Sequence, residues 1–356
     1  MKSSYKPELD GLRAISILLV IISHAGFGNL IPGGLGVTVF FFVSGYLITS
    51  LLIDERETKG RIDLYKFYLR RFWRLLPPMF FFLMLSIMLV LLVNKHVKIS
   101  DILAAIFYMA NYYKIFFHFE NLNGIVTSPF NILWSLAIEE HFYIIFAPLL
   151  AITYKSNQYF KVILAFLVIP LLVRLLSIYF FPSLLKDGGY NYSATEARID
   201  SIAFGCLLAC IFAGQKYQHW KNLLLNKNLL MFSVLLLIVT LLFRNLYFRE
   251  TFRYSLQNIS LLFIVANIVY GSSPFLLRIK KFLSAKYMIL LGKLSYSLYL
   301  QHWFALVVVT LLIGPAGQYA SWQASYWTLT ILFTLFSYYL VEKPTIGYRK
   351  KYGSNV

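Results

Sequence analysis

The chain has 356 residues, 59% of them apolar and only 13% charged, and it carries a net charge of +18. A typical soluble domain is about 45–50% apolar and about 25% charged, so this composition excludes an ordinary soluble fold. The basic residues stand in short clusters between apolar stretches, which is typical of membrane topology and not of a nucleic-acid-binding patch. We therefore predict an all-α polytopic integral membrane protein in which residues 1–356 form one membrane domain. We expect a lipid bilayer, and no nucleic acid, as its partner.

Ten segments are long and apolar enough for a spanning helix, which needs roughly 20 largely apolar residues. In chain order they are 11–27, 34–53, 76–94, 133–152, 159–181, 197–214, 228–246, 255–271, 293–313 and 324–341. The stretch 100–117 is more polar, because it carries Asn111, Lys114 and several tyrosines. We interpret it as a short re-entrant or interfacial segment beside about ten transmembrane helices.

An even number of spans, ten, puts both termini on one side of the membrane. The distribution of basic residues between the loops then indicates which side this is. The side that holds the termini carries 24 of the 33 Lys and Arg residues, and the opposite side carries 8. Arg174 is the remaining one and lies within the span 159–181. Because positive charge accumulates on the cytoplasmic side, we expect both termini in the cytoplasm and the chain in the cytoplasmic membrane of a bacterium.

The first span carries two ionisable residues, Arg13 and His24. On a regular helix, positions eleven residues apart differ by about 20° around the axis and by about 16 Å along it, so the two share a face. Charged groups inside a membrane are costly and mark functional sites. His24 fits a general base, and it also fits a packed polar residue that bonds to a neighbouring helix.

A glycine-rich turn, Gly33-Gly34-Leu35-Gly36, opens the second span, which contains the sequence from Phe40 to Ile48. Within it, Ser44-Gly45 allows helices to pack closely in lipid. The turn is not a dinucleotide-binding fingerprint, because no strand precedes it. Structural packing and substrate contact both fit this region.

Arg71 and Arg74 end the basic loop before the third span and, three residues apart, share a helix face. Arginine forks suit phosphate groups, so the pair could hold a polyanionic cofactor. A plain stop-transfer cluster would look similar. The prolines Pro77-Pro78 follow, and we expect them to open the span, where a missing N–H costs little.

The span 133–152 opens with Trp134 and Ser135 and then carries Glu139, Glu140 and His141. A carboxylate can orient a histidine and stabilise its protonated form, as in hydrolytic triads. Two adjacent carboxylates should also have coupled titrations. The segment does not match the zinc metalloprotease motif, which needs a second histidine four residues after the first.

Tyr296, Tyr299 and His302 share a helix face, so either substrate contact or packing fits them. Most of the remaining aromatic residues should be lipid-facing or interfacial.

Arg198 and Asp200 are interpreted as a structural pair, whereas Arg174 has no obvious local partner. Cys206 and Cys210 lie in one apolar segment and are interpreted as small core residues. Because no zinc or disulfide pattern is present, we expect no metal.

Together these motifs resemble the membrane acyltransferase-3 family. Arg13 and His24 match its arginine-x10-histidine pattern, Arg71 and Arg74 its arginine-x-x-arginine motif, and Trp134 to Tyr143 its tryptophan-serine-leucine and glutamate-glutamate block. Further landmarks are Phe40 to Ile48, Asn111-Tyr112, Arg198-Ile199-Asp200 with Gly205, Gly292, and Ser295 to His302. The landmarks run from Asp10 to Pro344, nearly the whole chain.

The resemblance implies a transmembrane O-acetyltransferase. Such members take acetyl from cytoplasmic acetyl-CoA and pass it to a hydroxyl of a cell-surface glycan or of its lipid-linked precursor. Because the chain ends soon after its tenth predicted span, we expect the kind without an added extracytoplasmic domain.

The resemblance also implies roles for particular residues. His24 would act as the base, with Arg13, Glu139 and Glu140 as further catalytic residues, and which glutamate partners His24 stays open. Arg71, Arg74, Trp134 and Ser135 would bind acetyl-CoA. Asn111, Tyr296, Tyr299 and His302 are candidates for the acceptor.

One function of another class also fits the composition. A secondary transporter or exporter of a glycan-related substrate would likewise show ten spans with buried charges. The combination of Arg13 and His24, Arg71 and Arg74, and the glutamate pair suits coenzyme A chemistry better than an alternating-access pore. The sequence leaves the acceptor sugar, the length of the acyl group and the oligomeric state open.

Overall fold

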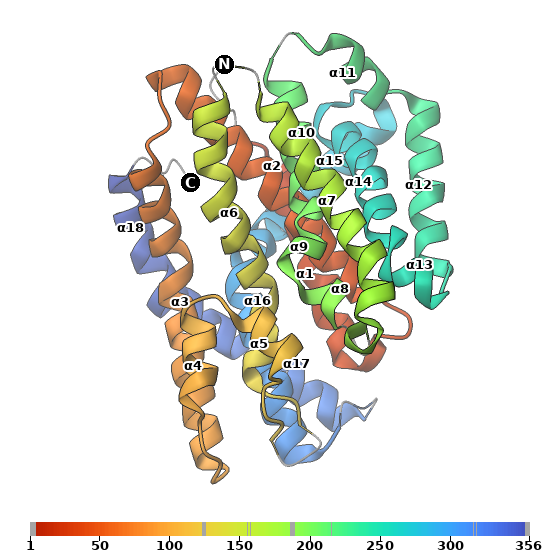
Figure 1. Cartoon of the computed structure of the whole chain (residues 1–356). Coiled ribbons are helices and arrows are strands. Elements are labelled where there is room, and N and C mark those ends of the chain that lie inside the picture. Colours follow the sequence, from red (N-terminus) through yellow and green to blue (C-terminus); the bar gives the residue numbers. More distant parts are fainter. Residues whose placement is uncertain are drawn as a thin grey trace. The chain divides into compact units, whose positions relative to one another are not determined.

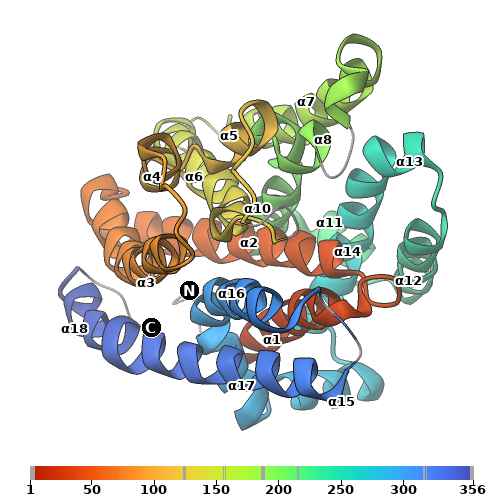
Figure 2. The ribbon, with the colours of Figure 1, turned by 90° about the horizontal axis from the view of Figure 1, so that it is seen from below.

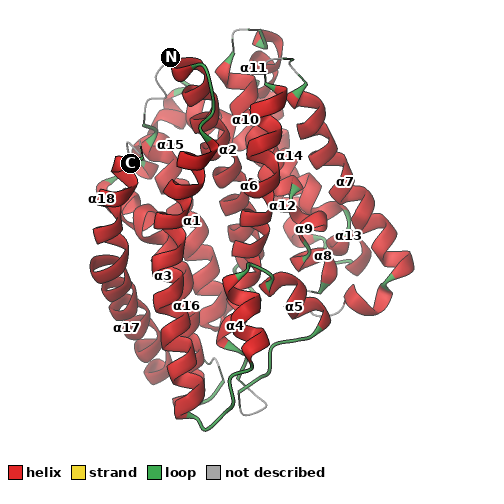
Figure 3. Ribbon diagram, turned by 60° about the vertical axis from the view of Figure 1, so that its left-hand side comes forward, coloured by secondary structure: helices red, strands yellow, loops and turns green. Residues whose placement is uncertain are grey.

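The computed structural model describes residues 5–122, 126–154, 156, 158–185, 189–214, 216–315, 317 and 319–352. All regular elements among them are helices (Figure 3), and one isolated antiparallel bridge joins Leu122 to Val126. In chain order the elements are α1 (Pro7–Ile22), η1 (Ser23–Phe27), α2 (Gly33–Lys59), α3 (Leu64–Leu92), α4 (Ile99–Ile106), α5 (Ala110–Phe116), η2 (Pro129–Leu133), α6 (Trp134–Thr153), α7 (Tyr159–Phe180), η3 (Pro182–Leu185), α8 (Tyr190–Ser193), α9 (Thr195–Arg198), α10 (Asp200–Ala213), α11 (Gln218–Leu224), α12 (Lys227–Leu242), α13 (Leu246–Glu250), α14 (Phe252–Tyr270), α15 (Pro274–Leu283), α16 (Lys286–Ile313), α17 (Ala320–Phe336), η4 (Ser337–Glu342) and α18 (Lys343–Lys351).

The predicted class, an all-α polytopic membrane protein, is confirmed. Eight helices among the described residues are long and apolar enough to cross a membrane: Pro7–Phe27, Gly33–Lys59, Leu64–Leu92, Pro129–Thr153, Tyr159–Phe180, Phe252–Tyr270, Lys286–Ile313 and Ala320–Tyr348. A ninth candidate is the pair α11 and α12, which is bent by 56°. The predicted segment 100–117 forms two short helices, α4 and α5, and its re-entrant or interfacial placement stays a prediction.

Two of the predicted spans differ from the structure. The segment 197–214 contains only the 14-residue helix α10, because residues 195–198 form the separate helix α9, in which Arg198 is fully buried. The predicted span 76–94 belongs to a longer helix, α3, which begins at Leu64 behind the N-cap Asp63. Pro77 and Pro78 therefore lie inside a helix and do not open one; neighbouring groups in a membrane protein can satisfy the backbone that prolines free.

The chain forms two compact units, each made of segments that are not consecutive in sequence. The first unit contains the described residues up to Ser16, together with Gly34–Ile62 and Ser135–Gly292. The second unit contains Ile17–Gly33, Asp63–Trp134 and the described residues from Lys293 onward. The prediction that residues 1–356 act as one membrane domain stays a prediction.

In the first unit, α2 and α10 touch through their backbones. A Cβ atom on Gly45 would lie 2.0 Å from the carbonyl oxygen of Ile202, and one on Gly205 would lie 1.9 Å from that of Phe42. Glycine on both sides of a crossing permits this approach, which is a common way for helices to associate in lipid. The buried thiol of Cys206 donates to the carbonyl of Gly45 at 3.6 Å, so the prediction of a small core residue is confirmed.

Helix α10 also packs against α7 and α14 in the first unit (Figure 1), where a buried polar network joins them. The guanidinium of Arg174 donates to Asp200 at 2.8 Å and to Ser255 at 2.6 Å, and both charged side chains are fully buried. It also donates to the carbonyls of Thr251 and Ala197. The predicted pairing of Asp200 with Arg198 is therefore wrong, because Arg174 on α7 reaches the carboxylate instead.

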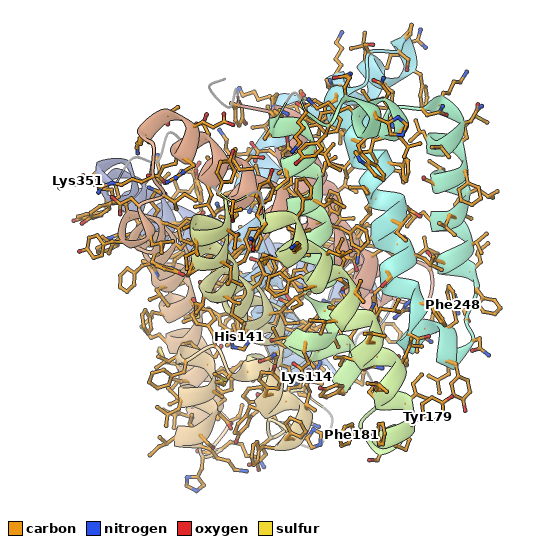
Figure 4. All side chains as sticks on the ribbon, turned by 45° about the horizontal axis from the view of Figure 1, so that its top comes forward. Lys114, His141, Tyr179, Phe181, Phe248 and Lys351 are labelled. Carbon is orange, nitrogen blue, oxygen red and sulfur yellow. The ribbon has the colours of Figure 1, made fainter. Side chains whose placement is uncertain are left out.

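Many large apolar side chains of the first unit are exposed, as on a lipid-facing surface. Tyr179 and Phe181 at the end of α7, and Phe248 on α13, are labelled in Figure 4; Tyr179 is 82% exposed. Aromatic rings at a helix end are typical of the membrane–water interface. This supports the expectation that many of the aromatic residues face lipid or its boundary.

The second unit is built around α3, α16 and α17. Helix α3 packs against α18 and η4, and the ring of Trp73 stacks on that of Tyr348 with centroids 4.7 Å apart. Helices α16 and α17 run beside each other (Figure 2), with Phe304 and Phe333 in an edge contact at 5.0 Å. Helix α16 carries several of the polar residues described next.

We expect Gly205→Ala to lower the stability of the first unit, because its Cβ would overlap the carbonyl oxygen of Phe42. Overpacking of this kind costs typically about 1–3 kcal/mol. Thermal unfolding of the purified protein in detergent would show a lower midpoint. The control is Gly347→Ala, since no atom lies within 4 Å of the added Cβ there. Equal midpoints for the two variants would contradict the close approach of α2 and α10.

Candidate active site

His24 lies in a distorted part of the first helix. Helix α1 ends at Ile22, and residues 23–27 form a π turn in which Gly26 has a φ of 98°. The regular α-helical spacing assumed between Arg13 and His24 therefore does not extend as far as His24. Single π turns often occur at functional sites, because the wider turn displaces a side chain and leaves backbone groups without their usual partners.

Two side chains from α17 bond to the backbone at this distortion. Gln323 donates its Nε2 to the carbonyl of Ala25 at 2.7 Å, and the hydroxyl of Tyr326 donates to the carbonyl of Ile21 at 3.2 Å. Because lipid supplies no hydrogen bonds, such partners make an irregular turn tolerable at membrane depth. They also fix the position from which His24 projects.

The ring of His24 meets that of His302 on α16. Nδ1 of His24 lies 3.1 Å from Nε2 of His302, and the ring planes differ by only 6°. His302 is fully buried, and its Nδ1 lies 2.9 Å from the carbonyl oxygen of Leu298. Trp303 meets the His24 ring in an edge contact, with centroids 5.0 Å apart. The sequence had suggested His302 only as an acceptor contact.

Three side-chain hydrogen bonds join α16 to neighbouring segments of the second unit. Trp303 donates its indole N–H to the carbonyl of Ser128, and the hydroxyl of Tyr299 donates to that of Ile132, both at 3.2 Å. The hydroxyl of Tyr296 donates to the carbonyl of Leu75 at 2.8 Å. These bonds account for the burial of both tyrosines, and their predicted contact with the acceptor stays a prediction.

Arg71 and Arg74 lie on α3 in the same unit. Arg71 is buried and Arg74 is partly exposed, so at least one guanidinium is accessible to a ligand. The bond from Tyr296 reaches the carbonyl of Leu75, the residue after Arg74. His302 is six residues beyond Tyr296, about 9 Å along α16 by helical rise. The arginine motif on α3 thus lies near the level of Tyr296, about two turns along α16 from His302.

The remaining predicted catalytic residues belong to the first unit. Glu139 on α6 accepts a hydrogen bond from Ser44 at 3.0 Å, and Nδ1 of His141 lies 2.7 Å from the hydroxyl of Thr195. The Glu139 contact joins the second-helix and glutamate motifs singled out in the sequence. Arg13, Ser135 and Glu140 also lie in the first unit, and the predicted roles of all four site residues stay predictions.

A family model described as an acyltransferase domain matches residues 6–342. The chain belongs to this acyltransferase family. O-acetyltransferase OatA of Staphylococcus aureus strain NCTC 8325 is 33% identical over 96% of the chain and 57% of its own length. Putative O-acetyltransferase SAS0844 of Staphylococcus aureus strain MSSA476 is 34% identical over 96% of the chain and 58% of its own length. The chain thus spans less than two thirds of these relatives, and no solved structure matches it.

Beyond the histidines, the second unit holds a cation next to a predicted donor-binding residue. Lys114 on α5 (Figure 4) lies with its Nζ 5.4 Å from the ring centroid of Trp134. Burial lowers the pKa of Lys114 from 10.5 to about 8. Asn111, one turn earlier, is fully buried. Sequence reasoning overlooked Lys114 and Trp303 as site residues, although each stands within three residues of a candidate.

We expect the burial of Lys114 to appear as a pH dependence of stability. Between pH 8 and 10.5 the unfolded chain binds a proton at Lys114 that the folded protein has released. The contribution of Lys114 to the free energy of unfolding therefore rises with pH across this window. Relative to Lys114→Met, the wild type should gain thermal stability from pH 7 to pH 10.

The matched control is Lys216→Met, which removes an exposed lysine in place of a buried one. Melting curves at pH 7, 8, 9 and 10 would measure both differences. A Lys114→Met difference that stays constant over this range would contradict the shifted titration.

Proposed function

We propose that this protein is a membrane O-acetyltransferase that passes an acetyl group from acetyl-CoA to a hydroxyl of a cell-surface glycan or of its lipid-linked precursor. The observation that carries the proposal is the His24–His302 pair, in which a histidine of the first span is held at 3.1 Å by a second imidazole. Membership of the acyltransferase family and the printed names of its relatives support the class of reaction.

His24 is the proposed base. Transfer to a hydroxyl requires removal of the hydroxyl proton as the oxygen attacks the acetyl carbon, and a neutral imidazole does this near neutral pH. The new bond joins the acceptor oxygen to the acetyl carbon, the carbon–sulfur bond breaks, and the proton returns from the imidazolium to the leaving thiolate. This sequence needs no covalent acetyl-enzyme.

Arg71 and Arg74 are the proposed site for the phosphates of acetyl-CoA, with Trp134 and Ser135 as further donor contacts. Paired guanidinium groups recognise phosphate oxygens through charge-assisted hydrogen bonds. The thioester of coenzyme A stands at the end of an extended pantetheine arm. The separation of about 9 Å along α16 between the two levels, from helical rise, is therefore one that the arm can span.

The proposed acceptor contacts are Asn111 and Tyr299, both buried in the second unit; Tyr296, whose hydroxyl bonds to the carbonyl of Leu75, lies at the level of the arginine motif instead. The charge asymmetry of the loops supports a cytoplasmic location for both termini and for the donor, in the cytoplasmic membrane of a bacterium. The acetyl group would then enter from the cytoplasm and be delivered to an acceptor on the other side.

We expect His24→Ala to abolish acetyl transfer, because removal of a general base typically costs about 10²–10⁴-fold in rate. The measurement is transfer of radiolabelled acetyl from acetyl-CoA to crude cell-envelope glycan by purified protein in proteoliposomes. The control is His219→Ala, since His219 is exposed on α11, and it should leave the rate unchanged.

The outcomes of this assay separate the candidate functions. Equal rates for wild type and His24→Ala would remove His24 as the base while leaving the enzyme. No consumption of acetyl-CoA by folded wild type would reject the O-acetyltransferase and favour transport of a glycan-related substrate.

We expect Arg74→Gln to raise the KM for acetyl-CoA about tenfold or more, because a hydrogen bond to a charged group contributes about 1.5–3 kcal/mol. The same variant should leave unchanged the rate with an acetyl thioester of cysteamine, which carries no phosphate. Arg278→Gln, on the exposed face of α15, is the control and should change neither value. An equal loss with both thioesters would place Arg74 outside the phosphate site.

A further inference from the structure

We propose that His302 is a positioning residue that holds His24 in the tautomer with its proton on Nδ1, so that Nε2 of His24 is the atom that takes the acceptor's proton. The consequence for catalysis rests on the proposed O-acetyltransferase function. The tautomer itself rests only on the hydrogen bonds of the histidine pair.

The first step is the bond between His302 and the backbone. Nδ1 of His302 lies 2.9 Å from the carbonyl oxygen of Leu298, four residues earlier on α16. A carbonyl oxygen can only accept, so the proton of a neutral His302 ring must lie on Nδ1. Its Nε2 is then an acceptor.

The second step passes this constraint to His24. Nδ1 of His24 lies 3.1 Å from Nε2 of His302, and an acceptor there requires a donor on His24. The ring centroids are 5.3 Å apart and the planes differ by 6°, so the bonded nitrogens lie nearly on the line between two coplanar rings. This is the direction in which a ring N–H points, and it makes the contact a hydrogen bond rather than ring stacking.

The third step identifies the basic atom. With its proton on Nδ1, a neutral His24 carries its free lone pair on Nε2. Among the residues that the structure describes, none bonds to this nitrogen. The edge contact with Trp303 and the bond from Gln323 to Ala25 hold the ring and the turn on either side of His24. Nε2 is therefore fixed and available to a substrate hydroxyl.

The two hydrogen bonds that join Leu298, His302 and His24 resemble those of a hydrolytic triad, in which a third group sets the tautomer of the base. When Nε2 of His24 takes the hydroxyl proton, Nδ1–H continues to donate to His302, which stabilises the imidazolium. A neutral imidazole serves here where triads use a carboxylate. This avoids burying an additional negative charge in a membrane segment, where charges are costly.

Two substitutions separate the two bonds of His302. In His302→Gln, the amide oxygen can occupy the place of Nε2 and accept from His24. In His302→Asn, the shorter amide can keep the bond to Leu298 but does not reach His24. We expect His302→Gln to retain most of the acetyl transfer and His302→Asn to lose about 10- to 100-fold, as is typical when a partner that orients an active group is removed.

The deciding measurement is nitrogen NMR of ring-labelled histidine in proteoliposomes, which reports the protonated nitrogen of each ring. The chain has six histidines, and a spectrum of His24→Gln identifies the His24 signals by difference. Wild type and His302→Gln should show His24 protonated on Nδ1 and bare on Nε2. His302→Asn should show a mixture of tautomers, and His219→Gln should leave the His24 signals unchanged.

His24 protonated on Nε2 in the wild type would overturn the inference without use of any variant. Equal activity and equal His24 spectra for His302→Gln and His302→Asn would also overturn it. A wild type with the expected tautomer but no acetyl transfer would reject the proposed function and leave the role of His302 in setting the tautomer intact.

Discussion

Hydrocarbon offers no hydrogen-bond partner, so each polar group at membrane depth must find its partner within the protein. This constraint accounts for two polar clusters, one around Arg174 in the first unit and one around His302 in the second. Arg174 is surrounded by Asp200, Ser255 and two carbonyls, and none of these contacts depends on water. His302 in the second unit is equally buried and is bonded at both ring nitrogens.

The same constraint separates polar residues with a structural role from those suited to catalysis. In the Arg174 network, the charges are matched within the first unit, and removing one partner would leave a buried charge uncompensated. The histidine pair ends differently, because the chain of bonds runs from a carbonyl to His302 and then to His24, with Nε2 of His24 left for another group. A general base requires such a nitrogen, which is held in place by the other hydrogen bonds and still has a lone pair for the substrate proton.

Helix distortion supplies the geometry. The π turn at residues 23–27 places His24, and a second π turn, η4, places Glu342, whose carboxylate accepts from Ser297 on α16 at 2.7 Å. Side chains of α17 bond to the first turn, and Ser297 of α16 bonds to the second. In each case the irregular turn gives a polar side chain of α16, His302 or Ser297, its partner. A regular first helix would direct its side chains by uniform rotation and would not provide the same position for His24.

The sequence by itself determined the all-α membrane fold, the approximate place of each span and the polar residues worth attention. These follow from composition and segment length, because hydrocarbon admits long apolar helices and penalises charge. It did not determine partners. His24 and His302 are 278 residues apart, and Asp200 bonds to Arg174 on α7 instead of to its neighbour Arg198. Nor did the pattern show that α3 passes through Pro77 and Pro78, or that the first helix ends in a π turn. Only the tertiary structure decided these points, because a hydrogen bond depends on where two helices bring their atoms, and periodicity along one helix carries no information about the other.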